Sequence, residues 1–328
     1  MADHDQAQEQ AQAQDIVALT APDITPYKTG NTGLDYVTTF DSGKGGPHVM
    51  ISAVVHGNEL CGAIALDHLF RHDVRPLTGR LTLAFMNVAA YERFDPQQPR
   101  ISRFVDEDFN RVWGLDVLKG DRDTVETRRA REVWPVVDTV DFLLDIHSMQ
   151  NINEPLMMAG PMVKGRQYAR DIGLPRTVVS DAGHAAGRRM RDYAPFIDPH
   201  SPRNALLVEC GQHWEEAAAD VALDVTYRYL LHHGMIPEDL ARQHMSAIPP
   251  QPQRFIEVSG PETIETDAFR FTEPFIGMEV IPKAGTVIGH DGDRPVVTPY
   301  DECVLIMPSR RLRKGESAVR YGRFLDAP

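Results

Sequence analysis

Cysteine is scarce in this chain of 328 residues, and Cys61, Cys210 and Cys303 lie far apart. They form no C-x-x-C pair and no even-numbered set, which excludes a disulfide framework and a cysteine-rich zinc knuckle. No run of about 18 apolar residues occurs, so no transmembrane helix is expected. The N-terminus is acidic and rich in Gln and Ala, unlike a signal peptide. We therefore expect a soluble, cytoplasmic protein.

Positive charge is also in short supply, because the formal net charge is −13. This excess of acid argues against nucleic acid or an anionic membrane as the main partner. Only six of the 34 basic residues are lysine, so 28 are arginine. The planar guanidinium suits carboxylate recognition, although codon usage explains such an excess equally simply.

The remaining composition, 42% hydrophobic and 25% charged residues, is that of a globular protein with room for about two domains. Short apolar runs alternate with helical patterns, which predicts an α/β fold with a mostly parallel or mixed sheet and helices on both faces. The expected strands are 48–55, 81–88, 141–146, 155–160, 177–180 and 204–209. The expected helices are 59–72, 124–134 and 214–233, with weaker patterns at 164–171 and 185–192.

The pattern divides the chain into three parts. Residues 1–20 are too polar to bury a core and are expected to form a disordered tail. Residues 21–247 carry the α/β pattern and form the predicted catalytic domain. A Pro-rich linker then leads into short strands separated by turn signals, which predicts a small all-β domain over 248–328.

The first candidate for chemistry is the pair His56 and Glu59, at the point where strand 48–55 meets the following helix. An H-x-x-E spacing places an imidazole and a carboxylate about one helical turn apart, close enough to share a zinc ion. The same spacing recurs in His213 and Glu216, so it is not specific by itself. Their Ala- and Glu-rich surroundings indicate a solvated helix start instead.

A second histidine, His147, ends the predicted strand with the sequence LLDIH. A single histidine in such a place is more often structural. Together with His56 and Glu59, however, it completes the three-ligand set of a catalytic zinc site with an open position for water. We therefore expect one Zn²⁺ per chain.

Hydrolysis also needs a proton shuttle that does not bind the metal. Glu209 ends the apolar strand NALLVE, where a carboxylate is costly unless it is paired or functional. A capped or salt-bridged structural glutamate is the alternative interpretation.

A charged, loop-like stretch at 99–114 contains Arg103, Asp108, Asn110 and Arg111. Most such loops are simply solvated. The functional alternative is a clamp for a substrate carboxylate made by the two arginines and Asn110. Asp108 would then orient a zinc-bound imidazole from behind.

Four segments, HGNE, DFNR, DIH and VECG, occur in this order and together resemble the succinylglutamate desuccinylase/aspartoacylase family, which is related to the zinc carboxypeptidases. The likeness spans about residues 48–215, and the β-rich end of the chain is similar in kind to the family's smaller C-terminal domain. The resemblance implies zinc ligands at His56, Glu59 and His147, a general base and acid at Glu209, a carbonyl-polarising Arg103, a substrate carboxylate held by Asn110 and Arg111, and an orienting Asp108.

The sequence departs from the family pattern at Pro199, where aspartoacylase-type sequences carry an arginine. Arg203 is the nearest candidate for binding a second substrate carboxylate. The turn after His147 also differs, and its methionine run is expected to be strand core.

The predicted function is a zinc-dependent amidohydrolase that removes the acyl group from an N-acyl amino acid, a small-molecule substrate. The alternative is a metallocarboxypeptidase acting on short peptides, which the small β domain disfavours because it would cover the site. A non-catalytic zinc- or metabolite-binding protein would require the loss of a catalytic residue, and none is missing. The acyl group, the amino acid and a possible homo-oligomer stay open.

Overall fold

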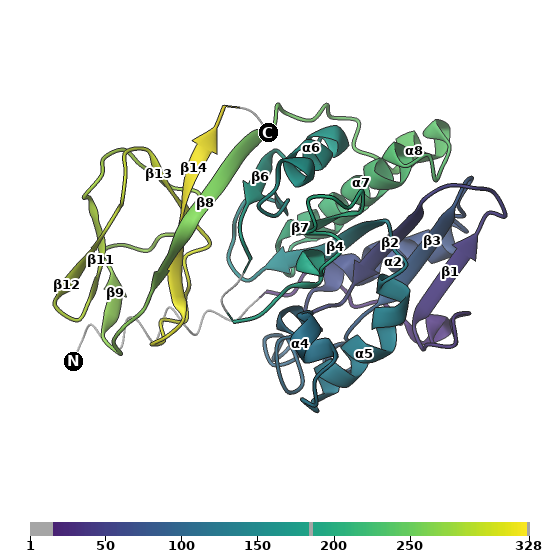
Figure 1. The fold of residues 1–328 in the computed structure, drawn as a ribbon, viewed down its shortest axis with the longest axis horizontal. Coiled ribbons are helices and arrows are strands. Elements are labelled where there is room, and N and C mark those ends of the chain that lie inside the picture. Colours follow the sequence, from purple (N-terminus) through teal and green to yellow (C-terminus); the bar gives the residue numbers. More distant parts are fainter. Residues whose placement is uncertain (1–15, 184–185, 327–328) are drawn as a thin grey trace.

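The computed structural model describes residues 16–183 and 186–326. Its central element is an eleven-stranded mixed sheet (Figure 1). Its strand order is β1-β3-β2-β4-β7-β5-β6-β8-β14-β13-β10. The strands β3, β2, β4 and β7 run parallel, and β1 and β5 are antiparallel to their neighbours β3 and β7. The predicted fold class, a mostly parallel or mixed sheet with helices on both faces, is confirmed.

Most predicted elements lie where the pattern placed them. The strands of the α/β part are β1 Val37–Asp41, β2 His48–Ala53, β3 Arg80–Phe85, β4 Phe142–Met149, β5 Leu156–Met158, β6 Thr177–Ser180 and β7 Asn204–Gln212. The helices are α2 Leu60–Arg71, α3 Val88–Tyr91, α4 Leu115–Leu118, α5 Val125–Val137, α6 Val163–Ile172, α7 Glu216–His232 and α8 Glu238–His244. The methionines of β5 are buried strand core, as expected.

The differences between prediction and structure concern short or edge elements. The edge strand β1 and the helices α3, α4 and α8 were not predicted, because each is too short for a strong periodic signal. The helix expected at 185–192 is reduced to a 3₁₀ turn at Met190–Asp192, and residue 185 lies outside the described part of the chain.

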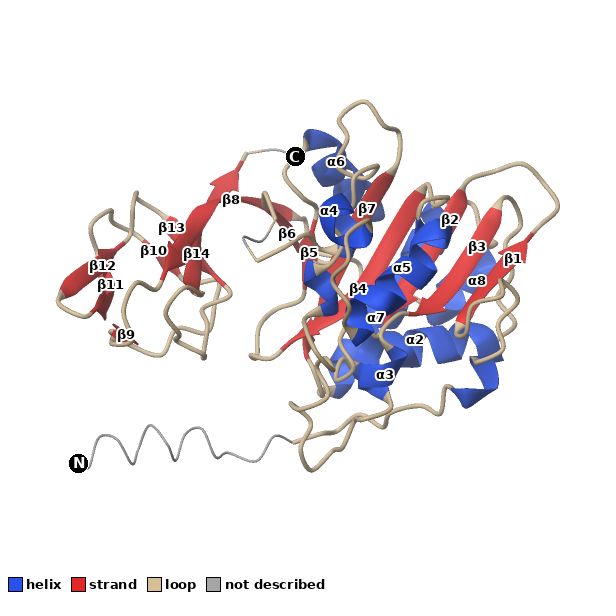
Figure 2. Ribbon diagram, turned by 60° about the horizontal axis from the view of Figure 1, so that its bottom comes forward, coloured by secondary structure: helices blue, strands red, loops and turns tan. Residues whose placement is uncertain are grey.

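Helices cover both faces of the sheet, as Figure 2 shows. Val49 and Ile51 of β2 point into a core with α2, α6, α7 and α8. Met50, between them, points into the opposite core with α4 and α5. Because β2 is covered on both faces, all its residues are buried, and apolar side chains at consecutive positions such as Val49, Met50 and Ile51 replace the alternating pattern.

The C-terminal part is built from short strands, and no helix occurs among its described residues. They are β8 Arg254–Thr263, β9 Phe269–Phe271, β10 Val280–Ile281, β11 Val287–Asp291, β12 Arg294–Val297, β13 Cys303–Ile306 and β14 Ser317–Leu325. β8 pairs parallel to β6, so the large sheet continues through the boundary predicted at 247/248. The strands β12, β11 and β9 form a separate small sheet farther out (Figure 1).

The N-terminal segment is anchored earlier than the sequence suggested. Residues 1–15 of the predicted 1–20 tail lie outside the described structure. The backbone amides of Ala18 and Leu19 donate to the carbonyl of Trp214, and the Leu19 side chain joins the main core. Among the described residues, no helix combines the length and apolar character needed to cross a membrane.

Gly57 lies in the turn between β2 and α2, and it is required by close packing. A Cβ atom at this position would lie 2.3 Å from the carbonyl carbon of Ala90 and 2.4 Å from the carbonyl oxygen of Ser102. Both are backbone atoms that cannot move away cheaply. Only a residue without a side chain therefore allows the backbone at position 57 to pass this close to Ala90 and Ser102.

Gly57→Ala should lower the free energy of unfolding by about 1–3 kcal/mol or more, because the added methyl group overpacks a backbone contact. Gly45→Ala is the matched control, since a Cβ there meets nothing within 4 Å. Urea unfolding of both variants gives the comparison. Equal stability of the two variants would contradict this role for Gly57.

Candidate active site

The candidate site lies at one edge of the sheet, where three neighbouring parallel strands end. β4 pairs with β2 on one side and with β7 on the other. In this register His147 of β4 lies directly opposite Glu209 of β7. The turn after β2 supplies His56 and Glu59, so the strand ends bring together residues that are up to 153 positions apart.

His56, Glu59 and His147 form a buried set of possible metal ligands. His56 Nδ1 lies 2.7 Å from one carboxylate oxygen of Glu59, and His147 Nδ1 lies 2.9 Å from the other. Glu59 thus connects the two imidazoles, and both Nδ1 atoms face the same point. Two imidazoles and a carboxylate are a ligand set that suits zinc.

Each imidazole is held from behind by an aspartate. His56 Nε2 lies 2.9 Å from Asp108 Oδ1. His147 Nε2 lies 2.9 Å from Asp145, whose other oxygen accepts a hydrogen bond from Ser52 Oγ. Such carboxylates fix the ring orientation and leave Nδ1 as the free ligand atom.

The charges of this cluster support one another. Burial disfavours the ionised form of Glu59, but His56 and His147 outweigh it and hold the pKa of Glu59 well below its ordinary value. Burial likewise lowers the pKa of His147, but Asp145 and Glu59 outweigh it and raise that pKa well above its ordinary value. Glu59 is therefore held as an anion in a buried position between the two imidazoles.

Glu209 differs from the other carboxylates because it has no ion-pair or hydrogen-bond partner for its Oε2 atom. The residue is half-buried, while this oxygen is sealed from solvent. Burial raises the pKa of Glu209 to about 8, with His147 acting in the opposite direction. The structural alternative, a capped or salt-bridged glutamate, does not describe this side chain.

The loop before α4 brings its charged residues to the same place. Asp108 precedes the 3₁₀ turn Phe109–Arg111 and accepts a hydrogen bond from the backbone amide of Asn110. The Asn110 side-chain oxygen accepts from the amide of Met190, which leaves its amide nitrogen as the donor. Arg103 contacts both Asp108 and Glu59, at 3.3 and 3.4 Å.

Arg203 is not brought to this site. It directly precedes β7, whereas Glu209 lies near the other end of that strand, roughly 20 Å away at the rise of a strand. Its guanidinium donates to the carbonyl oxygen of Asp138 instead. Proximity in sequence to Pro199 was a poor guide, because the extended strand carries the chain away from the site.

Two other arginines take part in the charge network of the site. Arg189 lies in a buried network with Asp181, at 2.5 Å, and Asp192. Arg320 of β14 reaches the same Asp181 at 3.2 Å. Arg320 was not predicted as a site residue, and it comes from the C-terminal part of the chain.

His213 corrects another expectation. It is fully buried, whereas a solvated helix start was predicted, and α7 begins only at Glu216. Its Nδ1 lies 2.8 Å from Ser148 Oγ, and the backbone amide of Ser148 donates to Glu59. Burial lowers the pKa of His213 to about 3, so the ring is neutral. It is linked to the ligand cluster through Ser148.

The sequence matches the model of the succinylglutamate desuccinylase/aspartoacylase catalytic domain over residues 45–228, more than half of the chain. The chain belongs to this family. The match contains all three possible metal ligands, Glu209 and the charged loop. No curated protein sequence matches the chain.

Several solved structures of other proteins share the fold. Succinylglutamate desuccinylase from Vibrio cholerae is 18% identical, with a TM-score of 0.65 over 90% of this chain and 88% of its own. A succinylglutamate desuccinylase/aspartoacylase from Rhodobacter sphaeroides is also 18% identical, with a TM-score of 0.57 over 89% of each chain. The ectoine utilization protein EutE (DoeB) from Ruegeria pomeroyi is 15% identical, with a TM-score of 0.57 over 89% of this chain and 92% of its own.

Glu209→Gln should stabilise the metal-free protein at alkaline pH relative to wild type. The pKa of Glu209 in the folded protein is raised from 4.5 to about 8. Its contribution to the free energy of unfolding is therefore most favourable below pH 4.5 and is lost as the pH rises towards 8. Glutamine does not titrate. Urea unfolding in EDTA should therefore show that Glu209→Gln has a higher free energy of unfolding than wild type, by more than about 1 kcal/mol at pH 8.5. The difference should be much smaller at pH 5. An equal difference at both pH values would contradict the raised pKa.

Proposed function

We propose that this protein is a zinc-dependent deacylase that hydrolyses the amide bond of an N-acyl amino acid. The observation that carries the proposal is the unpaired Glu209 carboxylate, which lies on the strand neighbouring His147 and beside a buried His-Glu-His set. A free proton acceptor next to a metal-ligand set is what hydrolysis requires. Family membership supports the same conclusion.

His56, Glu59 and His147 would hold one Zn²⁺ through two imidazole nitrogens and a carboxylate. The donor set fits, because both rings present Nδ1 towards Glu59 while Asp108 and Asp145 hold their other nitrogens. When bound, the metal supplies an acidified water and polarises the substrate carbonyl. Its positive charge would also lower the pKa of Glu209 from the raised value of the metal-free site.

Arg111 is suited to bind the substrate carboxylate because its charge is poorly compensated. The nearest carboxylate is Asp108, at 3.9 Å. Burial lowers the pKa of Arg111, Asp108 opposes this effect, and the neighbouring Arg103 and Arg189 lower it further. A carboxylate placed here would relieve the repulsion among these cations, with the Asn110 amide as a further donor.

The other two roles follow from position. Glu209 would take a proton from the attacking water and deliver it to the leaving amine nitrogen, so it acts as base and then as acid. Arg103, held by Asp108 and Glu59, would donate to the carbonyl oxygen as negative charge develops on it.

The C-terminal part favours a small substrate over a peptide. Asn151, in the loop after β4, donates to the carbonyl of Pro308, and Asn153 donates to that of Ile276. These bonds fasten the C-terminal part beside the ligand-bearing strand β4. We therefore keep the N-acyl amino acid as the substrate class, ahead of the metallocarboxypeptidase alternative.

Glu209→Gln is the central test of the proposed function. It removes the proton carrier without changing its size, so kcat on N-acyl amino acids should fall by about 10²-fold or more while zinc content stays at the wild-type level. His56→Ala should instead lose the zinc of this site in metal analysis. Glu216→Gln, at an exposed helix start, is the control and should keep full activity. Turnover by Glu209→Gln within a few-fold of wild type would remove Glu209 from the mechanism.

Arg111→Lys tests the carboxylate contact. It keeps the charge but loses the planar two-point geometry, so KM should rise by about tenfold or more. Substrates with an amidated carboxylate should be poor for the wild type and should show little further loss with the variant. Arg203→Lys is the matched control, since Arg203 lies at the other end of β7. A KM change with Arg203→Lys as large as with Arg111→Lys would contradict both assignments.

A further inference from the structure

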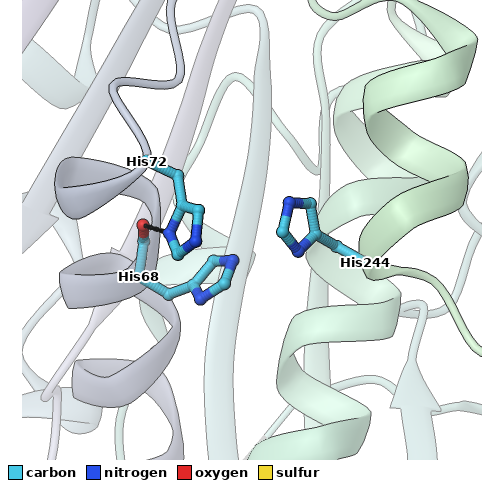
Figure 3. Close-up of side chains that lie close together, drawn as sticks. All are labelled: His68, His72 and His244. Carbon is cyan, nitrogen blue, oxygen red and sulfur yellow. Dashed lines mark hydrogen bonds between the residues drawn. The ribbon is translucent and has the colours of Figure 1, made fainter.

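Three histidines gather at the end of α2 that lies away from Glu59 (Figure 3). His68 lies in α2, His72 directly follows it, and His244 is the last residue of α8. One ring nitrogen of each lies within 4.8 Å of those of the other two. Figure 3 shows that His68 and His72 lie on one side and face His244 on the other.

The hydrogen bonding of His72 leaves a lone pair available for a ligand. Its Nδ1 lies 2.9 Å from the backbone carbonyl oxygen of His68. A carbonyl oxygen only accepts, so Nδ1 carries the proton and Nε2 carries the free lone pair. A backbone carbonyl behind one ring nitrogen is the usual support of a metal-bound histidine.

His68 provides a second, independent indication. Its Nε2 atom is buried and has no hydrogen-bond partner. Such an atom in a protein interior is costly and needs a reason. A metal ion bound by this nitrogen would supply the missing partner.

Packing fixes the third ring. His244 stacks on Tyr227 of α7, with ring centroids 4.6 Å apart and planes 20° from parallel. The same tyrosine meets His68 edge-on at 5.8 Å. Because Tyr227 holds both rings, little rearrangement is needed to bring the nitrogens around one ion.

We propose that His68, His72 and His244 bind a divalent transition metal of the zinc type. Three imidazoles suit Zn²⁺, Ni²⁺ or Cu²⁺, whereas Mg²⁺ and Ca²⁺ prefer oxygen ligands. The exposed position of His72 leaves room for water as a fourth ligand. The site is separate from the proposed active site, since position 68 lies nine residues along the helix from position 59, a rise of about 13 Å.

The expected consequence is a link between α2 and α8. His244 ends the last helix before the segment that leads to β8 and the C-terminal part of the chain. An ion bound by both helices would tie the end of α8 to the main core. Because an unfolded chain lacks this arrangement, zinc should stabilise the folded protein by mass action.

The test is the zinc content and the zinc-dependent Tm of four full-length proteins: wild type, His72→Gln, His244→Gln and His200→Gln. After dialysis against buffered zinc, wild type and His200→Gln should hold one zinc more than the two cluster variants. His200 is an exposed loop residue outside the cluster and is the matched control. In EDTA, His72→Gln should have the same Tm as wild type because His72 is exposed. Zinc should raise the Tm of this variant less than that of wild type. Deacylase activity should be unchanged in all variants.

Equal zinc content in wild type, His72→Gln and His244→Gln would overturn the proposal. The His56→Ala variant separates this outcome from a failure of the proposed function. It should lose the zinc of the active site and keep the zinc of this cluster. If His56→Ala retained all its zinc while His72→Gln lost one, the active-site assignment would fail and the present one would stand.

Discussion

The buried carboxylate of Glu59 is the group on which the rest of the site depends. A charge in the interior is tolerated only when surrounding groups compensate it. Glu59 receives this compensation from His56 and His147 on its two oxygens, from Arg103 and from the amide of Ser148. These groups come from three separate segments, the turn after β2, the loop that contains Arg103 and the strand β4, so the fold must bring all of them together for the carboxylate to stay ionised.

The order of the strands in the sheet brings these segments together. His56 follows β2, and His147 and Glu209 lie near the carboxyl ends of β4 and β7. These three strands are neighbours and parallel, so their carboxyl ends share one edge of the sheet. Gly62 allows α2 to approach closely, because a Cβ there would lie 2.8 Å from Ala53 and 3.2 Å from Ile146. The first turn of α2 is therefore held against β2 and β4, which fixes the place of Glu59.

This geometry explains what the sequence could predict. The ends of strongly apolar strands are visible in a sequence, so His56, His147 and Glu209 could be placed at one edge before the structure was known. Arg203 was misplaced because distance along an extended strand separates residues that are close in number. His213 was misjudged because its polar neighbours hide the burial of a single ring. Asp145 could have been found from its spacing, since residues two apart on a strand share a face.

Arg320 marks the limit of inference from the family motifs. The family match ends at residue 228, and it contains every group that we assign to the bond-breaking chemistry. Arg320 lies on β14, outside that match, yet it shares Asp181 with Arg189 and lies close enough to Arg111 to lower its pKa. No local pattern reveals such a residue, because its position depends on how the C-terminal strands pack against β6. In this arrangement the matched region would supply the reaction, and the C-terminal part would help to set the charge of the substrate that the site accepts.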